Sequence, residues 1–126
     1  MALAAGFERK DYRSGVGRSE AAMSRFVEML VESAFGVGRS ALHAPARGAA
    51  PVAFARQVAT YLCHVRLGLN YAAAGRVFGR DRMTAAHACS VIEERREDAS
   101  LDTLLDCLER SIDLRQYVDD GEVDHT

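Results

Sequence analysis

The sequence predicts an all-α protein of about five helices that contains a helix-turn-helix. Apolar residues recur at helical spacing, no segment has the alternating pattern of a strand, and residues typical of caps and turns separate the helical segments. The chain has 126 residues, 48% of them apolar, which is enough for one modest hydrophobic core. We expect a domain over residues 19–117, between a flexible N-terminal segment, 1–18, and a flexible acidic tail, 118–126.

The first two predicted helices follow from apolar spacing and from a proline near the start of the second. Over 19–35, apolar residues form one face of a helix and charged residues occupy the others. A connection rich in glycine, proline and alanine follows at 36–51, with a short helical turn around Leu42. Pro51 suits the first turn of the next helix, which Gly68 ends. Arg56, Gln57 and Thr60 are expected outside the apolar stripe of that helix.

The third and fourth predicted helices form the helix-turn-helix. Asn70 can cap the short third helix, 71–78, in which Gly75 leaves room for close packing. Gly79 can adopt a positive φ in the turn, and the Asp81 carboxylate can cap the fourth helix. The fourth helix has small apolar residues on one face, so it can pack closely on its neighbour while its N-terminal end stays exposed. Its buried positions are Ala85, Ala88, Cys89 and Ile92, and its exposed positions are Met83, His87, Ser90 and Glu94.

The last predicted helix has Ser100 as its cap and frays after Val118. Leucines and one isoleucine form its apolar face. The three cysteines are widely spaced and lie at apolar helical positions, so we expect reduced thiols in the core instead of disulfides. They are Cys63, Cys89 and Cys107.

The net charge of −2 conceals an uneven distribution of charges. Residues 33–92 contain seven arginines and one acid, whereas residues 93–126 contain four arginines and twelve acids. A basic block of this kind is expected of a nucleic-acid site. We therefore expect the central part of the chain to face nucleic acid and the acidic end to face away from it.

An ordered series of short motifs resembles the C-terminal DNA-binding domain of the bacterial replication initiator DnaA. The motifs are RQVATYL at 56–62, FG at 78–79, RD at 80–81, HAC at 87–89 and IE at 92–93. The resemblance covers roughly residues 26–108. It implies a Trp-repressor-like helical fold in which the recognition helix enters the major groove of a duplex and a basic loop reaches the minor groove.

The resemblance implies DNA contacts from three parts of the chain. Arg47 would be the arginine of the basic loop, and Arg56 and Gln57 would contact the phosphate backbone from the start of the long helix. The remaining contacts would come from the recognition end of the fourth helix. They are Arg80, Asp81, Arg82, Met83, Thr84 and His87.

The chain departs from the family's usual run, FGxRDHTTV, in ways that predict a different base preference. It has one residue fewer before Arg80, with Arg82 in place of histidine and Met83 in place of the first threonine. An arginine can donate two hydrogen bonds to guanine O6 and N7, a contact worth about 1–3 kcal/mol of discrimination. The basic loop keeps only Arg47, so tight binding can require a second protomer, and dimerisation through the first or the last helix stays open.

The sequence offers no signal for catalysis or metal binding. It contains no GxxxxGK[ST] phosphate loop, no recognisable nucleophile with its base, and no paired cysteine spacing, so we expect no enzyme, nucleotide, cofactor or metal. No apolar run is long enough to span a membrane, and we expect a cytoplasmic, nucleoid-associated protein.

The partner expected from these observations is double-stranded DNA, and the expected role is sequence-specific transcriptional regulation. Two alternatives remain open at this point. One is control of replication by competition for initiator boxes. The other is a protein-interaction module that keeps the fold without binding DNA.

Overall fold

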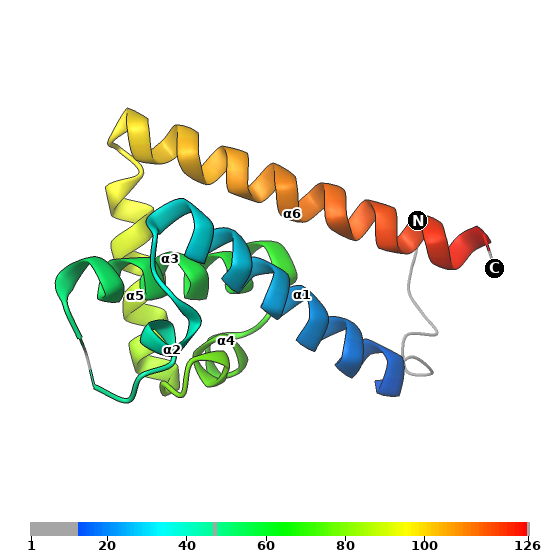
Figure 1. The fold of residues 1–126 in the computed structure, drawn as a ribbon, viewed down its shortest axis with the longest axis horizontal. Helices are drawn as coiled ribbons and strands as arrows, with labels where there is room; N and C mark the ends of the chain where they lie inside the picture. The colour runs from blue at the N-terminus through cyan, green and yellow to red at the C-terminus, as the bar shows by residue number, and fades with distance from the viewer. Residues whose placement is uncertain (1–12, 47, 126) are drawn as a thin grey trace.

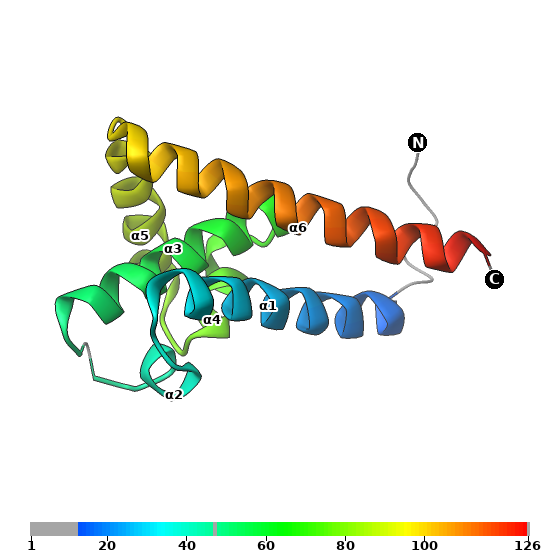
Figure 2. The ribbon, with the colours of Figure 1, turned by 45° about the horizontal axis from the view of Figure 1, so that its top comes forward.

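The computed structural model describes residues 13–46 and 48–125, which form six helices and no strand. The helices are α1 (Arg13–Phe35), α2 (Arg39–Leu42), α3 (Ala50–Leu67), α4 (Tyr71–Val77), α5 (Arg82–Arg95) and α6 (Ala99–His125). Helix α3 runs through the centre, and α1 and α6 project from the same side of the body (Figures 1 and 2). The all-α prediction is confirmed, and no helix in the described ranges is long and apolar enough to cross a membrane.

The hydrophobic core is organised around α3, which contacts each of the other five helices. Helix α5 crosses one end of α3, and α6 lies across both α3 and α1. The fully buried side chains come from every helix or its cap, so no helix can be removed without exposing apolar surface. The largest of them are Phe78, Leu42, Leu62, Ile92, Leu105, Ile112, Val27, Val31 and Val58.

The predicted caps and turns of the helix-turn-helix are confirmed. Asn70 Oδ1 accepts a hydrogen bond from the backbone N–H of Ala73 at 2.8 Å, which caps α4. Gly68 ends α3 with a φ of 74°, and Gly79 has a φ of 68° in the turn between α4 and α5. Both glycines occupy the left-handed region that side chains with a Cβ rarely adopt.

The outer helix boundaries differ from the prediction. Helix α1 begins at Arg13 instead of residue 19. Helix α6 is capped by Asp98 instead of Ser100, because Asp98 Oδ1 accepts from the N–H groups of Ser100 and Leu101 at 2.9 and 3.2 Å. It also continues to His125, past the expected fraying at Val118. No proline interrupts this end of the chain, and a single internal glycine costs a helix only about 1 kcal/mol.

Arg96 fastens α6 to the body. It follows α5, and its guanidinium donates to Asp102 at 2.6 Å, to Asp106 at 2.7 Å and to Glu109 at 2.8 Å. A fourth hydrogen bond, of 3.0 Å, reaches the hydroxyl of Tyr61 in α3. The carboxylates and the tyrosine raise the pKa of Arg96, although its partial burial alone would lower the pKa. Three of the twelve acids in residues 93–126 therefore serve this intramolecular contact.

The cysteines are only partly as predicted. Cys63 and Cys89 are buried, and burial raises their thiol pKa values to about 12 and about 11, so both stay protonated at neutral pH. Cys107 is exposed, so its predicted core position is wrong. It lies on the outer face of α6, away from Leu105 and Leu108, which supply the buried face.

Candidate nucleic-acid interface

Helices α4 and α5 approach each other closely at Gly75. The N–H of Arg80 donates to the carbonyl oxygen of Gly75 at 2.9 Å, which closes the turn. A Cβ on residue 75 would lie 2.7 Å from the carbonyl oxygen of Arg80 and 2.8 Å from that of Asp81. The fold therefore accepts only glycine here without moving the backbone that starts α5.

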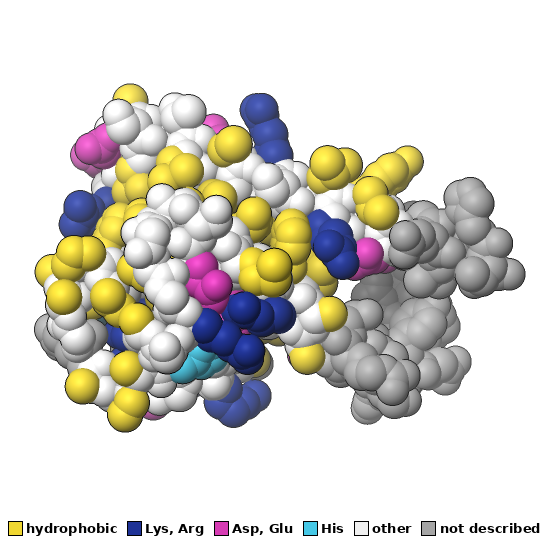
Figure 3. All heavy atoms as spheres, viewed as in Figure 1, with side chains coloured by type: hydrophobic (Ala, Val, Ile, Leu, Met, Phe, Trp, Pro, Cys, Tyr) yellow, Lys and Arg dark blue, Asp and Glu magenta, His cyan; other side chains and the backbone are white. Residues whose placement is uncertain are grey.

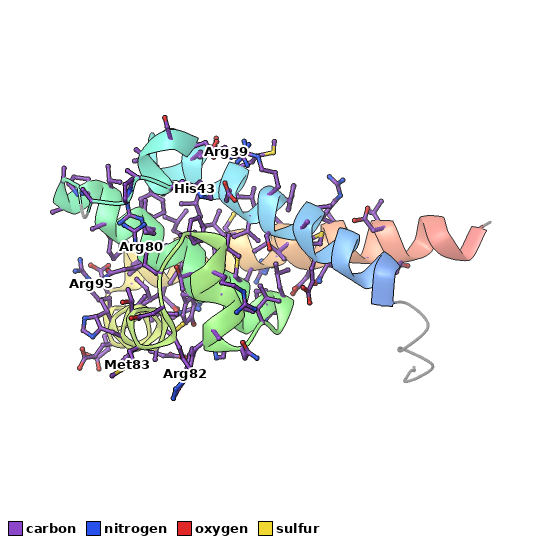
Figure 4. All side chains as sticks on the ribbon, turned by 90° about the horizontal axis from the view of Figure 1, so that it is seen from below. Arg39, His43, Arg80, Arg82, Met83 and Arg95 are labelled. Carbon is purple, nitrogen blue, oxygen red and sulfur yellow. The ribbon has the colours of Figure 1, made fainter. Side chains whose placement is uncertain are left out.

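Helix α5 presents its N-terminal end to solvent, as predicted. Met83 is 76% exposed, and Arg82, Thr84 and His87 are exposed beside it. Figure 4 shows Arg82 and Met83 pointing outward from α5. The four residues predicted for the opposite face, Ala85, Ala88, Cys89 and Ile92, are all buried.

Asp81 sets the geometry of that exposed end. Its Oδ1 accepts a hydrogen bond from the N–H of Thr84 at 2.8 Å, and its carbonyl oxygen accepts from the N–H of Ala85 at 3.1 Å. The hydrogen bonds from Thr84 lower the pKa of Asp81 below its ordinary value of 3.8, so the cap is charged at neutral pH. Asp81 is thus a cap that positions Arg82 and Met83, and a direct DNA contact from it stays a prediction.

A hollow of about 330 Å³ lies between the start of α3, the N-terminal half of α5 and the connection that precedes α3. It brings together side chains that lie far apart in the sequence. Five of the nine predicted site residues line it: Arg56, Gln57, Arg80, Thr84 and His87. Asp81, Arg82 and Met83 lie outside the hollow, and Arg47 lies outside the described residues.

Arg56 is not the surface residue that the helical pattern predicts. It is only 6% exposed, because α2 packs over it. Its Nε donates to the carbonyl oxygen of Leu42 at 2.7 Å and its Nη2 to that of Ala41 at 3.0 Å. Burial and, second, the charge of Arg80 lower the pKa of Arg56. Its observed contacts secure the end of α2, and its contact with a DNA phosphate stays a prediction.

Arg80 holds the other side of the same connection. Its guanidinium donates to the carbonyl oxygens of Ala44 at 2.9 Å, Phe78 at 2.8 Å and Ala46 at 3.3 Å. Figure 4 shows Arg80 between α5 and this connection, near His43. Arg56 and Arg80 thus tie residues 41–46 to the helix-turn-helix, a role that sequence reasoning missed because the bonded positions are 14 to 36 residues apart.

A buried carboxylate anchors α2 on its other side. Glu28 in α1 was expected outside the apolar face, but it is buried, and His43 Nε2 lies 2.9 Å from its Oε1. Arg25 donates to the same oxygen at 2.9 Å, and Arg39 Nε lies 3.6 Å from it. Two arginines and a histidine ring nitrogen thus surround the buried carboxylate, as burial requires. The connection that carries residue 47 therefore begins from a fixed point.

Arg95 is a further exposed cation near the hollow that the sequence pattern did not single out. It lies in the last turn of α5, and its guanidinium carbon is 4.7 Å from the centre of the Phe54 ring in α3. A cation held over an aromatic face keeps its charge and its hydrogen-bond donors. Arg95 thus places one positive charge where the end of α5 meets the start of α3.

A family model described as the bacterial dnaA protein helix-turn-helix matches residues 25–92, which is more than half of the chain. No curated protein and no solved structure matches the chain. The matched range includes the connection before α3, the hollow and the buried part of α5. Helix α6 lies outside the match.

Proposed function

Because this chain belongs to the bacterial DnaA helix-turn-helix family, we propose that it binds double-stranded DNA in a sequence-specific manner. The observation that carries the proposal is the exposed N-terminal end of α5 beside a hollow lined by Arg56 from α3 and Arg80 from the turn before α5. An α-helix presented in this way fits the major groove of B-form DNA.

The proposed contacts fall into two groups. Arg82, Met83, Thr84 and His87 project from the first turns of α5, where side chains can reach base edges. Gln57 lies in the wall of the hollow, where we assign it a phosphate contact that sets the register of the protein on the duplex. Arg47 and Arg56 are assigned to the backbone as well, and Asp81 and Arg80 to positioning.

The role that we propose is transcriptional regulation by occupancy in the bacterial cytoplasm, on the nucleoid. A site-specific binder blocks or recruits other proteins simply by being bound, and it needs no catalytic group to do so. Homodimerisation is part of this proposal, because two domains that hold two segments of one DNA molecule make twice the phosphate contacts of a single domain with a sparsely charged loop.

The proposal is tested by selecting duplexes from a random library with the purified protein and sequencing the retained pool. Enrichment of one motif is the expected result, with a guanine at the position that Arg82 reads. A motif like the initiator's own boxes would favour control of replication over transcription. Retention without enrichment would contradict sequence specificity, and no retention at low salt would favour a protein-interaction module.

Replacing Arg80 with alanine is expected to weaken binding to preferred and random duplexes alike, by about tenfold. The connection before α3 would lose its charged hydrogen bonds, each worth about 1.5–3 kcal/mol when intact, and would no longer be fixed beside the duplex. Arg80→Lys keeps the charge but cannot form the same fork to two carbonyl oxygens. Titration by fluorescence anisotropy that finds wild-type affinity for Arg80→Lys would contradict the positioning role.

A further inference from the structure

The outer face of α6 carries apolar side chains that the described body leaves uncovered. Leu114 is 62% exposed, Tyr117 is 75% exposed and Val118 is 44% exposed. Leu114 follows the buried Leu105 by nine residues, and Tyr117 follows the buried Leu108 by nine residues. Nine residues make two and a half helical turns, so each pair lies on opposite sides of α6. Leu114 and Tyr117 therefore point directly away from the body. Figure 3 shows hydrophobic side chains gathered over the projecting half of α6.

Exposed apolar residues that share one stripe usually mark a surface that another protein covers. The stripe here has the spacing of a helix-pairing seam, with steps of three, four and three residues from Cys107 through Arg110 and Leu114 to Tyr117. A helix with the same stripe complements it in length and in apolar content. A second copy of α6 meets both requirements.

The charge of Arg110 on the stripe favours an antiparallel pair over a parallel one. In a parallel pair, each Arg110 would face Arg110 of the second copy, which places like charges together. In an antiparallel pair centred on Leu114, Arg110 instead comes within a turn of the second copy's Tyr117 and Asp120. These two side chains offer an aromatic face and a carboxylate, and both are exposed.

We propose that α6 pairs with α6 of a second copy, antiparallel, about a two-fold axis at Leu114. Each Leu114 packs against its counterpart, and each Arg110 meets the opposite Tyr117 and Asp120. The contact occurs twice by symmetry, so the same patch serves both subunits. This pairing does not depend on DNA.

The position of α6 determines what such a dimer does with DNA, and this step rests on the proposed DNA binding. Helix α5 leads from its exposed N-terminal end to the turn before α6, a length of about 20 Å. The recognition end and the outer face of α6 therefore lie on opposite sides of the subunit (Figures 1 and 2). A dimer joined through α6 turns its two recognition ends away from each other, so it bridges two duplex segments instead of occupying adjacent half-sites.

Disulfide cross-linking of the full chain tests the geometry of the pair. In a Cys107→Ser background, Leu114→Cys is expected to form a covalent dimer under mild oxidation, because each residue 114 meets its symmetry mate. The wild-type Cys107 is not expected to cross-link, because an antiparallel pair separates the two thiols by many residues. Cross-linking through Cys107 but not through residue 114 would overturn the antiparallel arrangement.

Charge substitution tests the surface and its consequence. Leu114→Glu, at an exposed position that does not support the core, is expected to weaken dimerisation about a hundredfold or more, since each dimer loses two buried leucines. Ser100→Glu is the matched control: it adds the same charge to an exposed position in the first turn of α6, outside the pair. Sedimentation of the wild type at one chain mass, 13.7 kDa, at all concentrations up to about 100 µM would overturn the proposal.

Bridging is measured as the amount of labelled duplex that the protein captures on beads carrying a second duplex. The affinity for a single duplex is measured in solution for the same variants. The wild type and Ser100→Glu are expected to bridge, whereas Leu114→Glu binds single duplexes normally and does not bridge. Bridging by a Leu114→Glu protein that is monomeric would contradict the role of α6. Failure of the wild type to bind a single duplex would contradict the proposed DNA binding and leave the pairing untouched. Cross-linking at residue 114 measures the pairing in the absence of DNA.

Discussion

Replacing Gly75 with alanine is expected to destabilise the protein by about 1–3 kcal/mol and to abolish tight DNA binding. The new Cβ would stand 2.7 Å and 2.8 Å from the carbonyl oxygens of Arg80 and Asp81. Neither is a flexible side-chain end, so the backbone must move. The carbonyl of Asp81 accepts the first helical hydrogen bond of α5 from Ala85, and a shift there redirects the whole recognition end.

The sign of the change makes the Gly75 experiment decisive. Intrinsic helix propensity alone predicts that alanine stabilises α4 by about 1 kcal/mol. Urea denaturation should instead show a lower free energy of unfolding for Gly75→Ala. Gly38→Ala is the control, because a Cβ there meets nothing within 4 Å, and its effect should be much smaller. Stabilisation by Gly75→Ala would show that α4 and α5 are less closely packed than described.

The helix-turn-helix could be predicted from the sequence because its signals are local. The caps at Asn70 and Asp81 and the positive φ of Gly79 depend on residues within three or four positions of one another. The buried and exposed faces of α5 likewise follow from helical periodicity alone. The exposure of Arg82, Met83, Thr84 and His87 was therefore predictable, and it is confirmed.

The arrangement around the hollow could not be predicted, because it depends on contacts between distant parts of the chain. Periodicity placed Arg56 outside the apolar stripe of α3, but α2 folds back and covers it. Nothing near Arg80 in the sequence indicates that its guanidinium reaches the carbonyl oxygens of residues 44 and 46. Glu28 is buried for a similar reason, since His43 arrives from the far end of α2. Every residue has a backbone carbonyl, so the residue type does not show which carbonyl will accept a side-chain hydrogen bond.

The burial of Arg56 changes which substitutions can distinguish base reading from phosphate contact. Arg56→Ala would remove a buried anchor of α2, so lost binding could reflect lost structure. Arg82 and Gln57 are better probes. Arg82 is exposed, and Gln57 lines the hollow without being buried. Their substitutions should leave the free energy of unfolding nearly unchanged.

Arg82→Ala is expected to weaken binding to the selected duplex by about 10- to 100-fold, while binding to a scrambled duplex changes little. A guanidinium that donates to guanine O6 and N7 contributes only where that guanine is present, and its loss costs about 1–3 kcal/mol. Gln57→Ala should weaken both duplexes about equally, because phosphates are the same in every sequence. Anisotropy titrations of both duplexes at fixed salt compare the two variants directly.

The salt dependence of the same titrations separates the two roles of Arg82. If Arg82 reads a base, the slope of log affinity against log salt should stay close to that of the wild type. If it neutralises a phosphate, the slope should fall by about 0.9 and both duplexes should lose affinity equally. Arg82→Lys sharpens the comparison, because lysine keeps the charge but lacks the two-pronged donor. Full specificity in the lysine variant would mean that charge, and not the fork, selects the site.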